Sequence, residues 1–419
     1  MRRREFITLL GGATALPLAA RAVATTPSRA AAAPPLVTST HVGTYDFLRD
    51  PTINFQLNRW VSLGGDPLLR EIQAMLPRLG TLEGCRDEFS AASDRMLATG
   101  NQYEAAILAR GADFFLVASD PRKRHLRERF LTIVRAAWGV SEPDHVPFAN
   151  GYLPYYRFTP ANPRGTIVLF GGFDSYIEEF FSIMMNLRDQ GHDVVAFEGP
   201  GQGGALEDAG LAMTPDWQVP VGAIIDRLSL SGVTLIGISL GGCLAIRAAA
   251  HEPRVSRVVA WDALSDFLEA YLRQVPPAWQ ATLHALLSMR ADTVIDVMVN
   301  RSAHDPVQEW GLAQSMHVYG VSSPAAVLRA AASYRTQEIS PLVRQDVLLL
   351  AGAEDHYIPA HQVYDQAARL TNARSVTTRM FSRAEVAQAH CQIGNFPLAI
   401  QTVTDWLDRR LNTAAADRL

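Results

Sequence analysis

The sequence predicts an α/β fold with a mostly parallel sheet, and three observations support this prediction. After about residue 144, short and almost wholly apolar runs, typical of strands buried on both faces, alternate with amphipathic helical segments. A helical pattern precedes them, and a long, mostly helical insertion separates the last two runs. We therefore expect an N-terminal helical domain (41–143), a core in two parts (144–262 and 341–414) and a helical lid (263–340) over one end of the sheet.

The first 24 residues have the features of an export signal. A basic start containing Arg3-Arg4, a modest apolar stretch and the cleavage-site form Ala20-Arg21-Ala22 resemble a twin-arginine signal peptide. An amphipathic basic arm is the alternative. Residues 25–40 are rich in Ala, Pro, Thr and Ser and predict a flexible linker. We expect an exported protein, periplasmic or secreted, with no membrane attachment in its mature form, because the apolar stretch is too short for a stable span.

Composition limits the classes of partner. A content of 48% hydrophobic and 19% charged residues is that of an ordinary globular protein, and a net charge of −4 gives no electrostatic case for nucleic acid. Cys85, Cys243 and Cys391 are too widely spaced for a disulfide framework or a zinc site. We predict free thiols, no metal, no cofactor and a small-molecule substrate, and we leave a homodimer open.

Capping residues followed by proline mark predicted helix starts in the N-terminal region and in the insertion. Asp66-Pro67 and Asp120-Pro121 each place a capping carboxylate before a proline suited to the first helical position, and Ser323-Pro324 repeats the pattern in the insertion. Apolar residues then recur at helical spacing. The predicted helical segments of the N-terminal domain are 68–76, 88–97, 103–118 and 125–138.

The strand pattern begins with a hairpin. Asn150-Gly151, between two strand-like runs, is a strong signal for a tight hairpin turn. The following strands are predicted at 166–170, 193–197, 233–237, 255–261, 346–352 and 375–381, and a final helix at 397–411.

A serine lies where a buried strand meets a helix. In Gly237-Ile-Ser239-Leu-Gly241, the glycines permit a sharp turn that lifts the serine hydroxyl above the edge of the sheet. A glycine-rich packing turn with an idle serine is the alternative. The order of strand, turn and helix favours Ser239 as a nucleophile.

A nucleophilic serine needs a base and an acid that orients the base, and on such a sheet they follow in the order Ser, Asp or Glu, His. Asp355 lies in the loop after a predicted strand, with Glu354 as the neighbouring alternative. His390 lies between the last predicted strand and the final helix, and we predict it to be the base. We interpret His356 and His361 as local surface or capping residues.

Backbone groups near the serine complete the predicted site. Gly171-Gly172-Phe173 ends the strand at 166–170, where the N–H of Phe173 can pair with that of Leu240 to hold an oxyanion. The next residue, Asp174, is interpreted as the N-cap of the following helix in preference to a catalytic role.

One glycine motif matches a pattern for nucleotide binding, and we do not assign it that function. Gly199-Pro-Gly201-Gln-Gly-Gly204 satisfies the dinucleotide-binding pattern, but no second strand ends in an acid about twenty residues on, since Asp226 lies in a helical stretch. We interpret the motif as the loop after a sheet strand, with Glu198 near the edge of the active site.

The segments "LFGGFDSYIEEF", "VVAFEGPGQGG", "GISLGG" and "AHCQIGN", with the helical domain before them, resemble the serine α/β-hydrolase superfamily. Within it they are similar to the group that contains 2,6-dihydroxypseudooxynicotine hydrolase, the polyketide-shortening hydrolases and the FrsA-like esterases. The resemblance implies the α/β-hydrolase fold and a catalytic set of Ser239, Asp355 and His390. The spacing of Gly352, Asp355 and Pro359 resembles the family pattern and favours Asp355 over its neighbour.

The resemblance also implies a carbonyl substrate, because members of the group cleave esters or carbon–carbon bonds next to a ketone. In carbon–carbon hydrolases of the group a lid-side glutamate assists, and Glu269 is a loose match. With Gly172, Asp174 and Glu198 it forms the set that we expect near the substrate. A non-catalytic exported binding protein and an acyltransferase on the same fold remain the alternatives.

The insertion indicates the size of the substrate. Most of its large apolar residues are interpreted as the core of the lid itself, but so much apolar surface above the serine favours a fairly large, partly apolar substrate. These residues are Trp279, Leu283, Leu286, Leu287, Met289, Met298, Trp310, Met316 and Tyr319.

Overall fold

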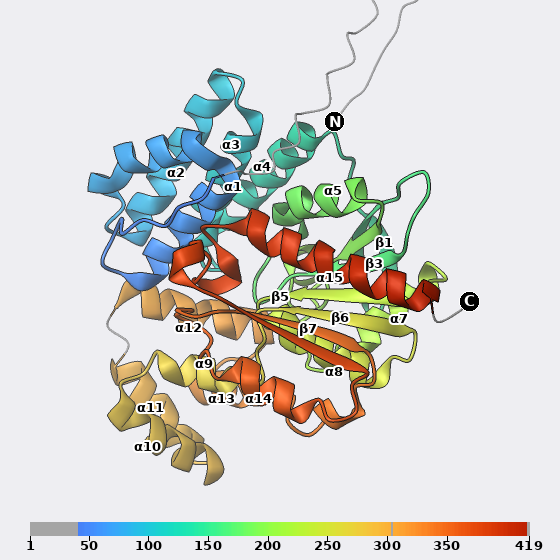
Figure 1. Cartoon of the computed structure of the whole chain (residues 1–419). Helices are drawn as coiled ribbons and strands as arrows, with labels where there is room; N and C mark the ends of the chain where they lie inside the picture. Colours follow the sequence, from blue (N-terminus) through green and yellow to red (C-terminus); the bar gives the residue numbers. More distant parts are fainter. Residues whose placement is uncertain (1–40, 303–304, 417–419) are drawn as a thin grey trace, which may run out of the picture. The chain divides into compact units, whose positions relative to one another are not determined.

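Eight strands form one sheet in the computed structural model, which describes residues 41–302 and 305–416 (Figure 1). The predicted signal peptide (1–24) and linker (25–40) lie outside the described residues. The strands are ordered β1-β2-β4-β3-β5-β6-β7-β8. Their bounds are β1 (Asp144–Phe148), β2 (Gly151–Phe158), β3 (Thr166–Phe170), β4 (Asp193–Phe197), β5 (Val233–Ile238), β6 (Val255–Trp261), β7 (Asp346–Gly352) and β8 (Ser375–Phe381).

The predicted mostly parallel sheet is confirmed. β1 and β2 form the antiparallel hairpin expected at Asn150-Gly151, β2 pairs antiparallel with β4, and every later pairing is parallel. β3, β4, β6, β7 and β8 have the predicted bounds, and β5 is one residue longer. The apolar runs predicted the strand bounds well because β4, β5 and β7 are buried at every position.

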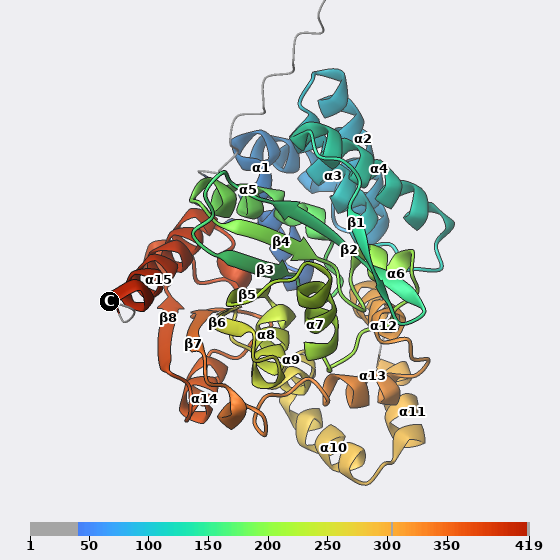
Figure 2. The same cartoon turned by 90° about the vertical axis from the view of Figure 1, so that its right-hand side faces the viewer.

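Helices cover both faces of the sheet, as Figure 2 shows. Along β3, Ile167 and Leu169 pack into one apolar cluster, while Val168 and Phe170 pack into the other. The first cluster includes residues of α5 (Phe181–Asp189) and α15 (Phe396–Ala416). The second includes residues of α7 (Gln218–Arg227), α8 (Leu240–His251) and α14 (Gln362–Arg369). The alternation of side chains along each strand thus divides the core in two.

Four helices and a short 3₁₀ turn make up the N-terminal region, and almost all of its buried apolar residues belong to the first cluster. These are α1 (Pro51–Met75), η1 (Leu76–Arg78), α2 (Leu82–Ala98), α3 (Gln102–Phe114) and α4 (Pro121–Trp138). Asp120 caps α4 as predicted, by accepting from the Arg122 N–H. Asp66-Pro67 does not begin a separate helix but follows a kink inside α1, where Gly65 has a φ of 67°.

The start of α1 was not predicted, although the sequence carries its signal. The carboxylate of Asp50 accepts from the Ile53 N–H at 2.8 Å, and Pro51 occupies the first helical position. This is the same Asp-Pro pattern that marks α4.

The described residues of the insertion fold into five helices, and Ser323 caps the last of them as predicted. They are α9 (Phe267–Arg273), α10 (Pro277–Ser288), α11 (Asp292–Ser302), α12 (Pro306–Tyr319) and α13 (Pro324–Ala331). Leu283 and Ile295 belong to a small apolar cluster of the insertion itself, whereas Tyr319 joins the second core cluster. Trp279 and Met289 are exposed, so they are not part of the core of the lid.

Short elements complete the chain. They are α6 (Gly203–Glu207), η2 (Ile177–Phe180), η3 (Ser340–Leu342), η4 (Arg383–Glu385) and η5 (His390–Gln392). Among the helices of the described residues, none has both the length and the apolar character that a membrane crossing requires.

Candidate active site

The turn between β5 and α8 holds Ser239 in a strained conformation. Its φ is 62° and its ψ −126°, a combination that residues with a side chain rarely adopt. The Ser239 N–H donates to the Trp261 carbonyl at 2.7 Å, which ties the turn to β6. A Cβ at Gly237 would lie 1.9 Å from the Gly241 carbonyl oxygen, so this turn requires glycine there. The structure thus contains the sharp turn that the sequence predicted.

The three residues predicted to form the catalytic set come together at one edge of the sheet. The Oγ of Ser239 lies 2.9 Å from Nε2 of His390, and Nδ1 of His390 lies 2.6 Å from Oδ2 of Asp355. The other oxygen of Asp355 accepts from the N–H groups of Tyr357 and Ile358, at 2.7 and 2.9 Å. This arrangement leaves Oδ2 of Asp355 directed at the imidazole.

The alternative acid and bases lie elsewhere. Glu354 forms an ion pair with Arg383 at the surface. His361 is exposed and lies 3.4 Å from Glu269. His356 differs from our interpretation as a surface or capping residue: its ring packs against Phe55 and its burial lowers the pKa of the imidazole to about 4.

One carboxylate at the site was not predicted from the sequence. Asp262 directly follows β6, and its Oδ2 lies 2.9 Å from Nδ1 of His390. The carboxylate also accepts from the Cys391 N–H and, at 2.8 Å, from the side-chain amide of Gln392. A signal was available, because the residue follows a buried parallel strand at the same sheet edge as the serine.

The two carboxylates change the acid–base behaviour of the imidazole. Burial lowers the pKa of His390, but the negative charges of Asp355 and Asp262 outweigh this effect and raise the pKa well above its ordinary value of 6.5. In turn, the charge of His390 overcomes burial and keeps the pKa of Asp262 below its ordinary value. The two carboxylates therefore stabilise the protonated form of the imidazole.

Asp262, His390 and Cys391 also form a group whose ligand atoms lie within 4.8 Å of one another. Both imidazole nitrogens already face partners within the protein, and burial raises the pKa of the Cys391 thiol to about 11. A thiol binds metals as thiolate, so the group fits a hydrogen-bonded base better than a metal site.

The loop after β3 lies against the serine turn. A Cβ at Gly172 would stand 2.8 Å from the Cβ of Ser239 and 2.9 Å from the backbone nitrogen of Leu240. Leu240 opens α8, where helix geometry leaves N–H groups without intrahelical acceptors. The close approach places the predicted oxyanion donors, the N–H groups of Leu240 and Phe173, on two segments that touch beside the hydroxyl.

Gln202, which sequence reasoning set aside with the glycine motif, holds this loop. Its side-chain amide nitrogen donates to the carbonyls of Gly171 and Gly172, at 2.7 and 3.0 Å. Its side-chain oxygen accepts from the Gly199 N–H at 3.0 Å. The loop after β4 therefore fixes the loop after β3.

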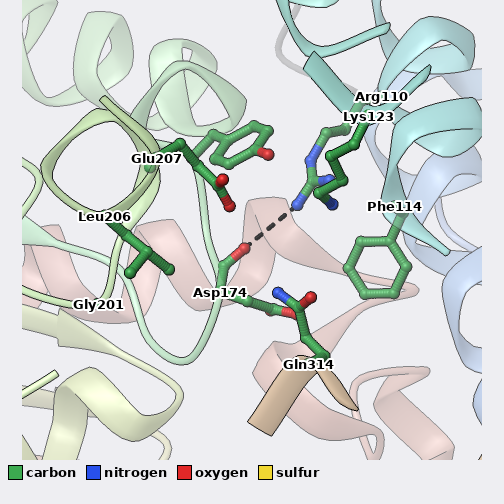
Figure 3. Close-up of a pocket in the computed structure, with 10 residues that line it drawn as sticks. Arg110, Phe114, Lys123, Asp174, Gly201, Leu206, Glu207 and Gln314 are labelled. Carbon is green, nitrogen blue, oxygen red and sulfur yellow. Dashed lines mark hydrogen bonds between the residues drawn. The ribbon is translucent and has the colours of Figure 1, made fainter. Parts of the chain in front are cut away.

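Asp174 lines a small pocket whose other walls come from the core, the N-terminal helices and α12, as Figure 3 shows. Its φ is 51°, and burial raises the pKa of its carboxyl to about 6. Asp174 is not the predicted N-cap, because the next helix, η2, begins at Ile177 and has Tyr176 as its N-cap. The carbonyl of Asp174 accepts from Nη2 of Arg110 at 3.3 Å, which links the loop to α3.

Arg110 is buried and connects the N-terminal region to the core. Its guanidinium donates to Glu179 at 2.8 Å and to Asp113 at 2.7 Å, in addition to the carbonyl of Asp174. Arg59 of α1 forms a further ion pair with Glu179. The residues around the pocket are thus held by charged groups from two helices of the N-terminal region.

The remaining predicted residues have different surroundings. Glu198 is buried, accepts from the Ile177 N–H at 2.9 Å and from the Gly204 N–H at 2.5 Å, and burial raises the pKa of its carboxyl to about 8. It thus ties two loops together. Glu269 lies on α9, where it accepts from the side chain of Gln362 at 2.8 Å, so its carboxylate is directed toward α14.

Comparisons with known proteins agree with this geometry. A family model for the alpha/beta hydrolase fold matches residues 165–384. The chain is 29% identical over 311 residues to the hydrolyase poxO of Penicillium oxalicum, and this alignment covers 67% of this chain and 72% of the relative. It is 30% identical over 318 residues to the hydrolase acrC of Aspergillus aculeatus, and this alignment covers 67% of this chain and 73% of the relative.

Solved structures show the same fold. AbyA5 has a TM-score of 0.62 at 18% identity, with 87% of this chain and 99% of that chain covered. 2,6-Dihydroxy-pseudo-oxynicotine hydrolase has a TM-score of 0.53 at 20% identity, with 78% and 86% covered. The family model spans more than half of the sequence, and the curated relatives are hydrolases. The chain therefore belongs to the α/β-hydrolase fold family and is a hydrolase.

Proposed function

We propose that this hydrolase cleaves a carbonyl substrate, either an ester or a ketone at its carbon–carbon bond, with Ser239 as nucleophile and His390 as base. The observation that supports the proposal is the continuous hydrogen-bonded series from the hydroxyl of Ser239 through the imidazole of His390 to the carboxylate of Asp355. A binding protein needs no such series, whereas acyl transfer uses its members as nucleophile, base and orienting acid.

The proposed reaction begins at the hydroxyl. Oγ of Ser239 attacks the carbonyl carbon and gives its proton to Nε2 of His390. The negative charge that forms on the carbonyl oxygen is stabilised by the N–H groups of Leu240 and Phe173. The bond to the leaving group then breaks, and the imidazolium returns the proton to the leaving oxygen or carbon. Water, activated by the neutral imidazole, releases the acyl group from Ser239 and restores the enzyme.

The aromatic surroundings support a partly apolar substrate. The ring of Phe173 lies 5.9 Å from that of Phe267 on α9 and 5.5 Å from that of Tyr319 on α12. The insertion therefore covers the loop that carries a proposed oxyanion donor. Such a cover excludes water from the site and strengthens the oxyanion contacts.

Replacing Ser239 with alanine tests the proposal. A fluorophosphonate probe should label the wild-type protein, and Ser239→Ala should abolish the label and lower turnover of active esters by several orders of magnitude. Ser288→Ala, at an exposed position of α10, is the matched control and should behave as wild type. Undiminished labelling or turnover in Ser239→Ala would overturn the proposal.

A further inference from the structure

We propose that Asp262 is a second acid for His390, a positioning residue that shares the Nδ1 proton with Asp355. The inference rests on the proposed role of His390 as base. Nδ1 of His390 lies 2.6 Å from Oδ2 of Asp355 and 2.9 Å from Oδ2 of Asp262, so both carboxylates are within hydrogen-bonding distance of one N–H group. They reach it from the ends of two adjacent strands, β7 and β6.

Asp262 is built into this position. Its side chain is only 1% exposed, and its backbone has a φ of 71°. Its Oδ1 accepts from Gln392, and its Oδ2 accepts from the Cys391 N–H, the residue directly after the base. A Cβ at Gly242 would lie 2.1 Å from the Asp262 carbonyl oxygen, which shows how closely the strand end packs against α8. A buried, strained carboxylate at this distance has a cost that the fold alone does not explain.

The immediate hydrogen-bond network supports a shared role. Asp355 uses its Oδ1 for the loop after β7 and directs its Oδ2 to the imidazole. Asp262 uses its Oδ1 for Gln392, and its Oδ2 faces both the Cys391 N–H and the same imidazole nitrogen. If one acid lost its charge, the other would still fix the tautomer with the proton on Nδ1. Loss of the correct tautomer is the main damage when the single acid of such a set becomes an amide.

The charges around the imidazole set the sign of the pH effect. The titratable and charged groups that face His390 or its acids are Asp262, Asp355, His356, Tyr357, Cys391 and Arg273. Among them the two carboxylates stabilise the imidazolium. Removing either charge therefore makes the neutral, reactive imidazole available at lower pH.

The experiment measures the rate of fluorophosphonate labelling across a wide pH range, which requires no knowledge of the natural substrate. The labelling rate should rise with pH as the imidazole of His390 loses its proton. In Asp262→Asn this rise, the acid limb of the profile, should move to lower pH by about one unit or more. Asparagine tolerates positive φ as aspartate does and has the same shape, so the turn is retained. Glu354→Gln is the matched control: it removes a carboxylate next to Asp355 that does not contact the imidazole, and its limb should stay in place.

A second comparison decides the matter even if Asp262→Asn does not fold. In Asp355→Asn the labelling rate should exceed that of His390→Ala by at least about a hundredfold, because Asp262 still holds the ring. If Asp355→Asn is as slow as His390→Ala, or if a folded Asp262→Asn keeps the wild-type limb, the inference is wrong. If the wild-type protein is not labelled at Ser239 at all, the proposed function itself fails.

Discussion

At the scale of single residues, backbone strain is concentrated beside the proposed nucleophile. Ser239, Asp174 and Asp262 all have positive φ, which costs a residue with a side chain roughly 1–3 kcal/mol. Each lies directly after a strand or in the loop that follows one, at the same edge of the sheet. The surrounding contacts must offset this cost, and they do so with buried hydrogen bonds such as that from Ser239 to Trp261.

The raised pKa of His390 predicts an unusual pH dependence. Only the neutral imidazole can accept the serine proton, so turnover of an ester should rise with pH as this group loses its proton. Because the pKa of His390 lies well above 6.5, kcat/KM should rise at a higher pH than it would with an ordinary histidine as the base. The profile should be measured with a substrate that does not titrate. A limb at or below the ordinary value would contradict the proposed environment of the base.

At the scale of elements, three loops that follow parallel strands position the proposed oxyanion donors. The loop after β3 lies against the turn after β5, and Gln202 in the loop after β4 holds it there through two carbonyls. None of these loops is close to another in sequence, but parallel strands bring their carboxyl ends to one edge. Positioning of the proposed oxyanion donors thus depends on a side chain that does not reach the hydroxyl.

Replacing Gln202 with methionine should weaken catalysis without unfolding the protein. The substitution keeps the length of the side chain but removes the donors to Gly171 and Gly172. We expect kcat to fall by about tenfold to a hundredfold, with KM changed less, because oxyanion donors act mainly in the transition state. Gln401→Met, at an exposed position of α15, is the control. An unchanged kcat in Gln202→Met would show that the loop is held without it.

At the scale of the whole molecule, the N-terminal helices and the insertion meet near the site. Trp310 of α12 packs against Phe114 and Phe115, with ring centroids 5.3 and 5.2 Å apart. Arg110 of α3 reaches the loop after β3. The loops of the sheet therefore carry the proposed reacting groups, and both helical parts contact the loop after β3 beside them.

This division predicts a preference for bulky substrates. In a series of esters of increasing acyl length and ring size, kcat/KM should rise toward the larger, partly aromatic members, because their apolar surface is buried under the insertion. Phe267→Ala, which removes a ring beside Phe173, should flatten the preference. Trp279→Ala, at an exposed position of α10, should leave it unchanged. If small polar acetate esters are cleaved best by the wild-type protein, the lid interpretation is wrong.

The sequence by itself determined the sheet and the positions of its chemistry-bearing loops. Strands buried on both faces are continuous apolar runs, so their bounds could be read almost to the residue, and the glycines at 237 and 241 marked the sharp turn. Chain order, with the family-like spacing that favoured Asp355 over its neighbour, then pointed to Ser239, Asp355 and His390, which the structure brings together. Their catalytic roles stay a prediction until the serine is replaced.

Only the tertiary structure decided how these residues are held. The second acid Asp262, the brace formed by Gln202 and the burial of His356 depend on which loop ends touch at the sheet edge. The interpretation of Asp174 as an N-cap failed for the same reason: a local pattern favoured a helix start, but the loop is directed by contacts with Gln202 and Arg110 from distant segments. Local propensity determines strands and helices, whereas side-chain roles at a loop depend on neighbours that sequence spacing does not reveal.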